Sequence, residues 1–164
     1  MNINEINALS QEAFERSFGE VAEHSPWVAA RAADARPFAN REAMITAFAA
    51  VVMAAADSEK LALLQAHPDL ATRASLSADS TREQAGVGLG NLTSEEFAQF
   101  TEFNESYKHE NGFPFIFAVR GATKGQILKA FEQRHSNSVA HEFETALEQV
   151  CRIMKFRLED RVDS

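Results

Sequence analysis

The sequence predicts an all-α fold, a single domain over residues 1–164 with about seven to eight helices in a compact bundle. Apolar residues recur three and four positions apart along most of the chain, as on the buried face of a helix. Ser, Thr or Asn, which favour N-cap positions, precede most of these stripes. Alternation typical of a strand is confined to residues 113–119, which is too little for a sheet.

The first helices are expected to begin at serines. Ser10 is the predicted N-cap of one helix, and Ser25-Pro26 resembles an N-cap followed by proline at the first helical position. The second helix must end before Pro37, because a residue that precedes proline avoids the α region. The apolar faces of these helices are formed by Phe14, Phe18, Val21, Trp27 and Ala30.

The next helices are expected after Asn40 and Ser58. The helix capped by Asn40 carries the longest apolar stripe, so it is the best candidate for a central buried helix. The helix opened by Ser58 should end at His67-Pro68, because proline does not continue it, and a cap at Asp69 predicts one or two turns over residues 69–76. The two stripes consist of Met44, Ile45, Phe48, Val51, Val52, Ala55, Leu61 and Leu64.

Three more helices are predicted in the C-terminal half. The segments 93–96 and 123–126 are capping boxes, in which the first and fourth residues each bond the other's backbone N–H. Ser138 opens the last and longest helix. The apolar faces of the three helices are formed by Phe97, Phe100, Phe103 and Tyr107; by Ile127, Leu128 and Phe131; and by Phe143, Leu147, Val150, Met154 and Leu158.

Charge and cysteine content exclude several classes of function. The formal net charge of −8 argues against a nucleic-acid or anionic-membrane surface, because both need a concentrated basic face. The single Cys151 allows neither an intramolecular disulfide nor a multi-cysteine zinc site, and it fits a reducing cytoplasm. The N-terminus lacks the regions of a signal peptide, and no apolar run approaches the roughly 20 residues that span a bilayer. We therefore expect a cytoplasmic protein.

His67-Pro68 is the first candidate for a functional site. A histidine at the end of a helix is often only a cation that the helix dipole favours. It can equally act as a general acid or base, because imidazole has the side-chain pKa closest to neutral pH. Pro68 would hold the ring at a rigid corner of the chain.

The segment Ser80 to Gln84 is the second candidate. As a capping box, Ser80 and Glu83 would bond each other's backbone N–H, which is a structural role. In the functional interpretation, the segment forms a helix N-terminus where free amides and the dipole favour an anion. Three glycines at positions 86, 88 and 90 then allow close backbone approach.

The segment from Asn111 to Arg120 is the third candidate. It follows an expected helix end and is too apolar for the surface, so a buried connection is the simplest interpretation. Its backbone N–H and C=O groups must still be paired, and a ligand with amide-like edges could pair them. The guanidinium of Arg120 would suit a carboxylate.

No metal site is predicted. Glu132-Gln133-Arg134-His135 matches one half of a helical di-iron pattern, but the second Glu-x-x-His is absent. From the residues alone, a non-catalytic helical interaction module and a metal-dependent helical hydrolase stay open as alternatives to a cofactor-free enzyme.

The three segments together resemble the 2-oxo-4-hydroxy-4-carboxy-5-ureidoimidazoline (OHCU) decarboxylase family of urate degradation. The matching features, in order and spacing, are His67-Pro68-Asp69-Leu70-Ala71, Ser80-x-x-Glu83-Gln84-x-x-Gly, the helix from Leu92 to Tyr107, and Gly112-Phe113-Pro114-Phe115-Ile116. The resemblance covers nearly the whole chain. The first block alone is a weak signal, whereas all of them in register are specific.

The resemblance implies a carboxy-lyase that converts OHCU to (S)-allantoin and carbon dioxide without a cofactor. It implies that His67 is the proton donor, and Glu83 is the second catalytic candidate. It implies a homodimer with a small ureidoimidazoline as substrate. The substrate-binding residues expected from it are Pro68, Ser80, Thr81, Arg82, Glu83, Gln84, Phe115, Ile116, Phe117, Ala118 and Val119. Arg120 is added to them as a contact for the substrate carboxylate, from its guanidinium chemistry alone.

Overall fold

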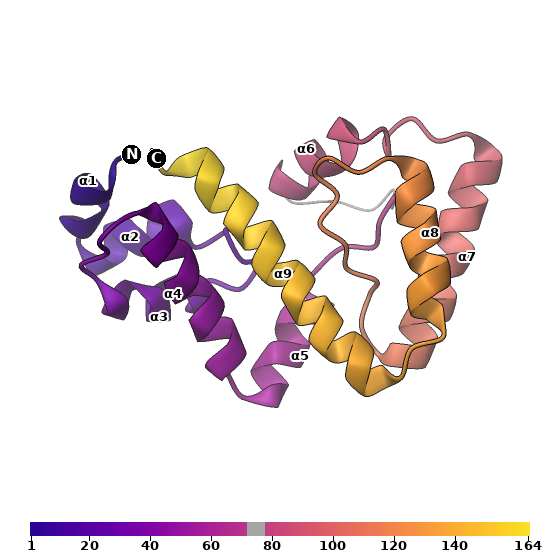
Figure 1. Cartoon of the computed structure of the whole chain (residues 1–164), viewed down its shortest axis with the longest axis horizontal. Helices are drawn as coiled ribbons and strands as arrows, with labels where there is room; N and C mark the ends of the chain where they lie inside the picture. Colours follow the sequence, from indigo (N-terminus) through magenta and orange to yellow (C-terminus); the bar gives the residue numbers. More distant parts are fainter. Residues whose placement is uncertain (72–77) are drawn as a thin grey trace. The chain divides into compact units, whose positions relative to one another are not determined.

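The structure, a computed structural model, describes residues 1–71 and 78–164. Within these residues it contains nine α-helices, one short 3-10 helix and no strand, which confirms the all-α prediction (Figure 1). The chain divides into two compact units. Unit 1 comprises Met1–Ala66 with Val150–Ser164, and unit 2 comprises His67–Gln149. That the whole chain behaves as one domain stays a prediction.

Unit 1 is built around α3, which packs against both α2 and α4. The Phe14 ring lies 5.0 Å from the Phe18 ring and 6.3 Å from the Phe48 ring, forming an aromatic core. The elements of unit 1 are α1 (Ile3–Asn7), α2 (Gln11–Phe18), α3 (Trp27–Ala32), η1 (Ala33–Ala35), α4 (Arg41–Ala54), α5 (Asp57–Gln65) and the C-terminal part of α9 (Val139–Arg161). The short α1 was not predicted, because five residues are too few for a recognisable apolar stripe.

The interior of unit 1 contains an ion pair as well as rings. Arg157 Nη1 lies 2.8 Å from Glu23 Oε2, and both side chains are almost completely buried. The same nitrogen donates to the Val21 carbonyl at 3.3 Å. Removing either partner would leave an uncompensated charge in the core, so this pair ties α9 to the turn after α2.

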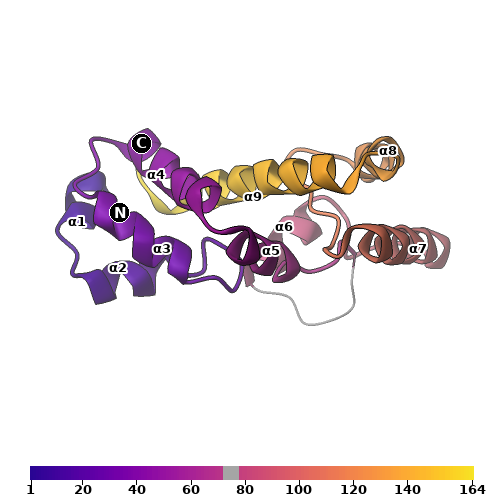
Figure 2. The same ribbon diagram turned by 90° about the horizontal axis from the view of Figure 1, so that it is seen from below.

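Unit 2 contains α6 (Ala78–Gly86), α7 (Ser94–Asn111), α8 (Lys124–His135) and the N-terminal part of α9. Helices α7 and α8 lie side by side and run in the same direction (Figures 1 and 2). Lys124 Nζ lies 3.2 Å from Glu96 Oε2 where both helices begin, and Ser106 Oγ lies 3.1 Å from His135 Nε2 nearer their ends. The connection 112–123 therefore returns the chain along the helices, which places an extended segment inside unit 2.

Most predicted helix starts are confirmed by their caps. The side chains of Ser10, Asn40, Thr93, Thr123 and Ser138 each accept a hydrogen bond from the backbone N–H three residues later. Glu96 and Gln126 complete the two predicted capping boxes. These caps are local in sequence, which is why residue patterns predicted them.

Other predicted boundaries were wrong. Helix α5 begins at Asp57 rather than after Ser58, because the Glu59 carboxylate accepts from the Ala56 N–H at 3.2 Å and fixes the earlier start. Helix α3 begins at Trp27, so Pro26 occupies the N-cap position that was expected for Ser25. Leu61 was assigned to the apolar face of α5, yet its side chain is 36% exposed, and Leu63 is buried beside Leu64 instead.

Two further predicted segments have different outcomes. Residues 113–119 are extended but pair with no strand in the described part of the chain, so the possible strand is not formed. The turns predicted over residues 69–76 lie partly outside the described residues, and residues 69–71 are not helical.

Candidate active site

The corner at His67 opens unit 2. His67 follows Ala66, the C-cap of α5, and its side chain is 8% exposed. Helix α7 holds the residues that follow it. Asn104 Nδ2 donates to the Leu70 carbonyl at 2.7 Å, and Lys108 Nζ pairs with Asp69 Oδ2 at 2.9 Å. The imidazole is therefore buried at the start of a short segment that is anchored to a long, rigid helix.

A hydrogen bond joins the first and second candidate segments. The Ala71 N–H donates to Gln84 Oε1 of α6 at 2.9 Å, and Gln84 is 7% exposed. Because this bond uses the carboxamide oxygen, the Gln84 side chain can offer a ligand chiefly its N–H groups. The structure thus brings together the His67 segment and α6, which are separated in sequence by residues outside the described part.

The bounds of helix α6 contradict the prediction that Ser80 is an N-cap. The helix begins at Ala78, so Ser80 is its third residue and Glu83 lies well inside it. A capping box between Ser80 and Glu83 is therefore wrong, because the N-cap precedes the first helical residue. Ser80 is buried and Glu83 is half-buried, so both side chains lie toward the interior of unit 2 rather than fully in solvent.

Three predicted site residues present exposed side chains. Thr81 and Arg82 lie on the outer side of α6, where Arg82 forms an ion pair with Asp79. Arg120, at the end of the extended segment, is also exposed. The structure does not bring these side chains into the interior with Ser80 and Gln84.

The third candidate segment is buried as predicted. Phe115, Ile116, Ala118 and Val119 are all 6% exposed or less, and Phe117 is half-buried. The Phe115 ring stacks on the Phe131 ring of α8 at 3.8 Å. Figures 1 and 2 both show the connection 112–123 passing beside α6, so the second and third candidate segments are neighbours within unit 2.

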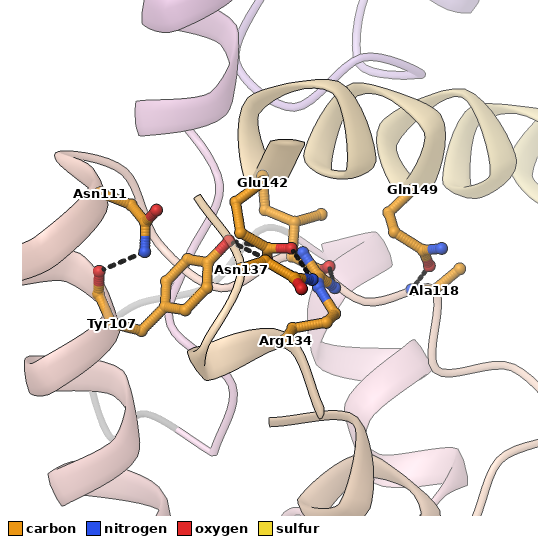
Figure 3. A network of polar contacts seen from close by, with 8 residues as sticks. Tyr107, Asn111, Ala118, Arg134, Asn137, Glu142 and Gln149 are labelled. Carbon is orange, nitrogen blue, oxygen red and sulfur yellow. Dashed lines mark hydrogen bonds and ion pairs between the residues drawn. The ribbon is translucent and has the colours of Figure 1, made fainter. Parts of the chain in front are cut away.

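A network of polar side chains from other parts of unit 2 holds this segment in place (Figure 3). Arg134 Nη1 donates to the Ile116 carbonyl at 2.7 Å, and Arg134 Nε donates to Glu142 Oε1 at 2.8 Å. The Tyr107 hydroxyl donates to the same carboxylate oxygen at 2.6 Å, and Asn137 Nδ2 donates to the other at 3.0 Å. The Glu142 carboxylate is therefore satisfied on both oxygens inside the protein.

Burial and charge act together on Tyr107. Loss of solvent and the hydrogen bond to the Glu142 carboxylate raise the pKa of the Tyr107 phenol well above its ordinary value, and the Arg134 charge opposes this only in part. Tyr107 therefore stays protonated and remains a donor to Glu142. Its ring also meets the Phe115 ring edge-on at 5.2 Å, so the network and the extended segment share one core.

Known proteins resemble this chain over nearly its whole length. Residues 7–159 match the sequence model of OHCU decarboxylase. The chain belongs to the OHCU decarboxylase family. It is 38% identical to 2-oxo-4-hydroxy-4-carboxy-5-ureidoimidazoline decarboxylase of Haloferax volcanii, over 100% of this chain and 98% of that protein. It is 37% identical to a uric acid degradation bifunctional protein of Bacillus subtilis, covering 96% of this chain and 32% of that protein.

Solved structures agree with this family. The fold matches the crystal structure of (S)-allantoin synthase with a TM-score of 0.82 and 30% identity, over 100% of this chain and 55% of that chain. It also matches a crystal structure of OHCU decarboxylase in the presence of (S)-allantoin with a TM-score of 0.71, covering 93% of this chain and 97% of that chain. At 20% identity the second likeness supports the fold alone.

Several residues that hold the candidate segments of this OHCU decarboxylase family member in place were not predicted. Arg134 and Gln149 hydrogen-bond the extended segment, Glu142 pairs with Arg134, and Asn104 hydrogen-bonds the His67 segment. One of these residues could have been found from the sequence. Arg134 follows Ile127 and Phe131 at helical spacing, so it is a charged residue on the apolar face of the predicted helix.

Within the part of the chain that the structure describes, neither a metal-ligand group nor a membrane-spanning helix is found. No group of three or more His, Cys, Asp or Glu side chains there is placed to hold a metal ion. No helix among them is long and apolar enough to cross a membrane.

Proposed function

We propose that this chain decarboxylates OHCU to (S)-allantoin in urate degradation, with His67 as the proton donor. The observation that carries the assignment is the buried His67, which lies in a segment hydrogen-bonded through Ala71 to Gln84, in a chain of the OHCU decarboxylase family. The named relatives and the matched allantoin synthase support the same reaction.

For this reaction the enzyme must stabilise the negative charge that develops on the substrate and deliver one proton to it. The bond between the ring carbon and the carboxylate breaks, carbon dioxide leaves, and the electron pair is delocalised into the adjacent imine and carbonyl system. The hydroxyl on the carbon that lost the carboxylate gives its proton to the former imine nitrogen and becomes the carbonyl of allantoin. A proton from His67 is added to the ureido-bearing carbon, which creates the stereocentre of (S)-allantoin. A buried donor at a fixed corner delivers this proton to one face only.

The other candidate residues hold the substrate. Glu83 accepts from the substrate's hydroxyl or ureido N–H groups, and Gln84 donates to its oxygen atoms. Ser80, Pro68 and the first turns of α6 at Thr81 and Arg82 line the same region, where the positive end of the helix dipole favours an anion. Backbone groups from Phe115 to Val119 meet the ring, and Arg120 would have to turn inward to contact a carboxylate.

The proposal is tested by adding purified protein to freshly generated OHCU and following chirality by circular dichroism. Wild type should produce (S)-allantoin, and His67→Asn should fold normally but lose stereospecific formation. His109→Asn on the exposed face of α7 is the matched control and should keep full activity. Near-wild-type turnover by His67→Asn would disprove the His67 assignment.

We also propose that the enzyme works without a cofactor, as a cytoplasmic homodimer. The delocalised electron pair makes a metal sink unnecessary, so activity should survive exhaustive chelation. The family resemblance favours the homodimer, and the single cysteine fits a reducing compartment. Sedimentation of the purified protein tests the dimer, and loss of activity on chelation would contradict the cofactor-free reaction.

A further inference from the structure

The backbone on both sides of Phe117 is held by side chains from other elements. Arg134 Nη1 of α8 donates to the Ile116 carbonyl at 2.7 Å. Gln149 Oε1 of α9 accepts from the Ala118 N–H at 2.9 Å, as Figure 3 shows. These two bonds act on consecutive peptide units, the one before Phe117 and the one after it.

The geometry of the peptide unit then fixes where Phe117 points its own polar groups. In a planar trans peptide the C=O and N–H point in opposite directions. In the described residues the cis bond is Arg36-Pro37, so both units beside Phe117 are trans. The Phe117 N–H is therefore directed away from the Arg134 guanidinium, and the Phe117 C=O is directed away from the Gln149 carboxamide.

Phe117 consequently offers one donor and one acceptor, spaced as on the edge of a strand. Neither group forms a hydrogen bond with the described residues. A buried or half-buried backbone needs partners for such groups. The –NH–C(=O)– edge of a cyclic ureide carries the complementary acceptor and donor.

The energetics of the network also point to a role beyond stability. Arg134 is 9% exposed, pairs with a buried Glu142, and lies 4.2 Å over the Phe115 ring. A buried ion pair seldom stabilises a fold more than apolar residues of similar volume would. A donor that must stay aimed at the Ile116 carbonyl, however, requires a guanidinium with fixed partners.

We propose that Arg134 and Gln149 are positioning residues that hold the Phe117 N–H and C=O as the binding edge for the ureide ring. This rests on the proposed function. Gln149 gives the cleaner test, because Arg134→Lys would leave Glu142 poorly paired in the core and could prevent folding. Gln149 is half-buried, and its bond to the Ala118 N–H uses only the carboxamide oxygen.

Three variants on α9 separate the possibilities. Gln149→Leu removes the acceptor for the Ala118 N–H, Gln149→Glu keeps an acceptor in place, and Glu148→Leu makes the same apolar change at an exposed neighbour. Binding of (S)-allantoin, hydantoin and N-methylhydantoins is measured by calorimetry, with kcat and KM for OHCU beside it. Melting temperatures check the fold.

The expected result is specific to Gln149→Leu. Its Kd for (S)-allantoin and its KM should rise about tenfold with kcat little changed, because a ground-state contact is lost. Its preference for hydantoin over the N-methylhydantoins should shrink. Gln149→Glu and Glu148→Leu should behave as wild type.

Other outcomes overturn the proposal or its foundation separately. Equal ureide binding by Gln149→Leu and Glu148→Leu overturns the positioning role, and so does a loss of stability and kcat with unchanged Kd. If wild type binds ureides in the expected pattern but does not decarboxylate OHCU, the proposed function fails while the positioning role stands.

Discussion

Gln84 forms a structural hydrogen bond at a position where a substrate contact is predicted. Its oxygen accepts a hydrogen bond from the Ala71 N–H at 2.9 Å. The sequence predicted a substrate contact at this position but not the bond that holds the His67 segment against α6. The structural role of this side chain is therefore shown, and its contact with substrate stays a prediction.

Gln84→Met should lower the free energy of unfolding of unit 2. The change leaves the Ala71 N–H buried without its acceptor, which costs about 1–3 kcal/mol. Urea denaturation measures the loss, and Gln99→Met on the exposed face of α7 is the matched control. Identical midpoints for the two variants would show that the bond contributes nothing to stability.

Glu83→Gln separates chemistry from structure. Glu and Gln have similar helix propensities, so α6 should remain intact and the melting temperature unchanged. A contact that requires the carboxylate would reduce kcat/KM about a hundredfold or more. Glu105→Gln, exposed on α7, serves as the control. A variant with full activity would remove Glu83 from the catalytic residues.

At the scale of elements, the end of α7 decides where the buried segment starts. Gly112 is the C-cap of α7 with φ of 79°, and its N–H donates to the Lys108 carbonyl at 2.9 Å. Residues with a side chain rarely adopt this left-handed conformation. The glycine therefore turns the chain from a long helix into the segment that returns along α7 and α8.

Gly112→Ala should destabilise the protein although nothing crowds the added carbon. Apart from Gly112 itself and its two chain neighbours, no residue has an atom within 4 Å of a Cβ built there, so the cost is the left-handed conformation alone, about 1–2 kcal/mol. Gly125→Ala inside α8 is the matched control and should be neutral or stabilising. Thermal unfolding of both variants compares them, and equal stability would contradict the backbone argument.

The Tyr107 phenol predicts how unit 2 responds to alkali. Its pKa is raised in the folded state, so its contribution to stability is complete below the unfolded value of about 10 and is lost as the pH rises toward the folded value. Stability should therefore fall above about pH 10. Tyr107→Phe, which cannot titrate, should show a weaker fall in urea midpoints across the same range. Parallel curves would contradict the assignment.

The elements also show what sequence patterns can and cannot predict. Helix starts at Asn40, Thr93 and Thr123 were predicted because a cap and its partner lie three residues apart. The bond from Tyr107 to Glu142 joins residues 35 positions apart, so no local pattern contains it. The start of α6 at Ala78 was missed because Ser80 followed by Glu83 has the local pattern of a capping box.

At the scale of the molecule, the division into units was not visible in the sequence. The sequence around the boundary between Ala66 and His67 does not have the composition of a linker. Helix α9 also continues from one unit into the other. Every candidate site residue belongs to unit 2. The sequence could nevertheless identify the three candidate segments by residue type and order, although the contacts between them are not local; that they form the site stays a prediction.

The aromatic composition allows the two units to be followed separately by optical spectroscopy. The one tryptophan, Trp27, belongs to unit 1, and the one tyrosine, Tyr107, lies in the polar network of unit 2. Each unit thus carries its own intrinsic chromophore. Tryptophan fluorescence and the near-ultraviolet dichroism of tyrosine should give coincident melting curves if the chain is one cooperative domain, as predicted. Two separate transitions would make each half of the protein visible by itself, without any added label.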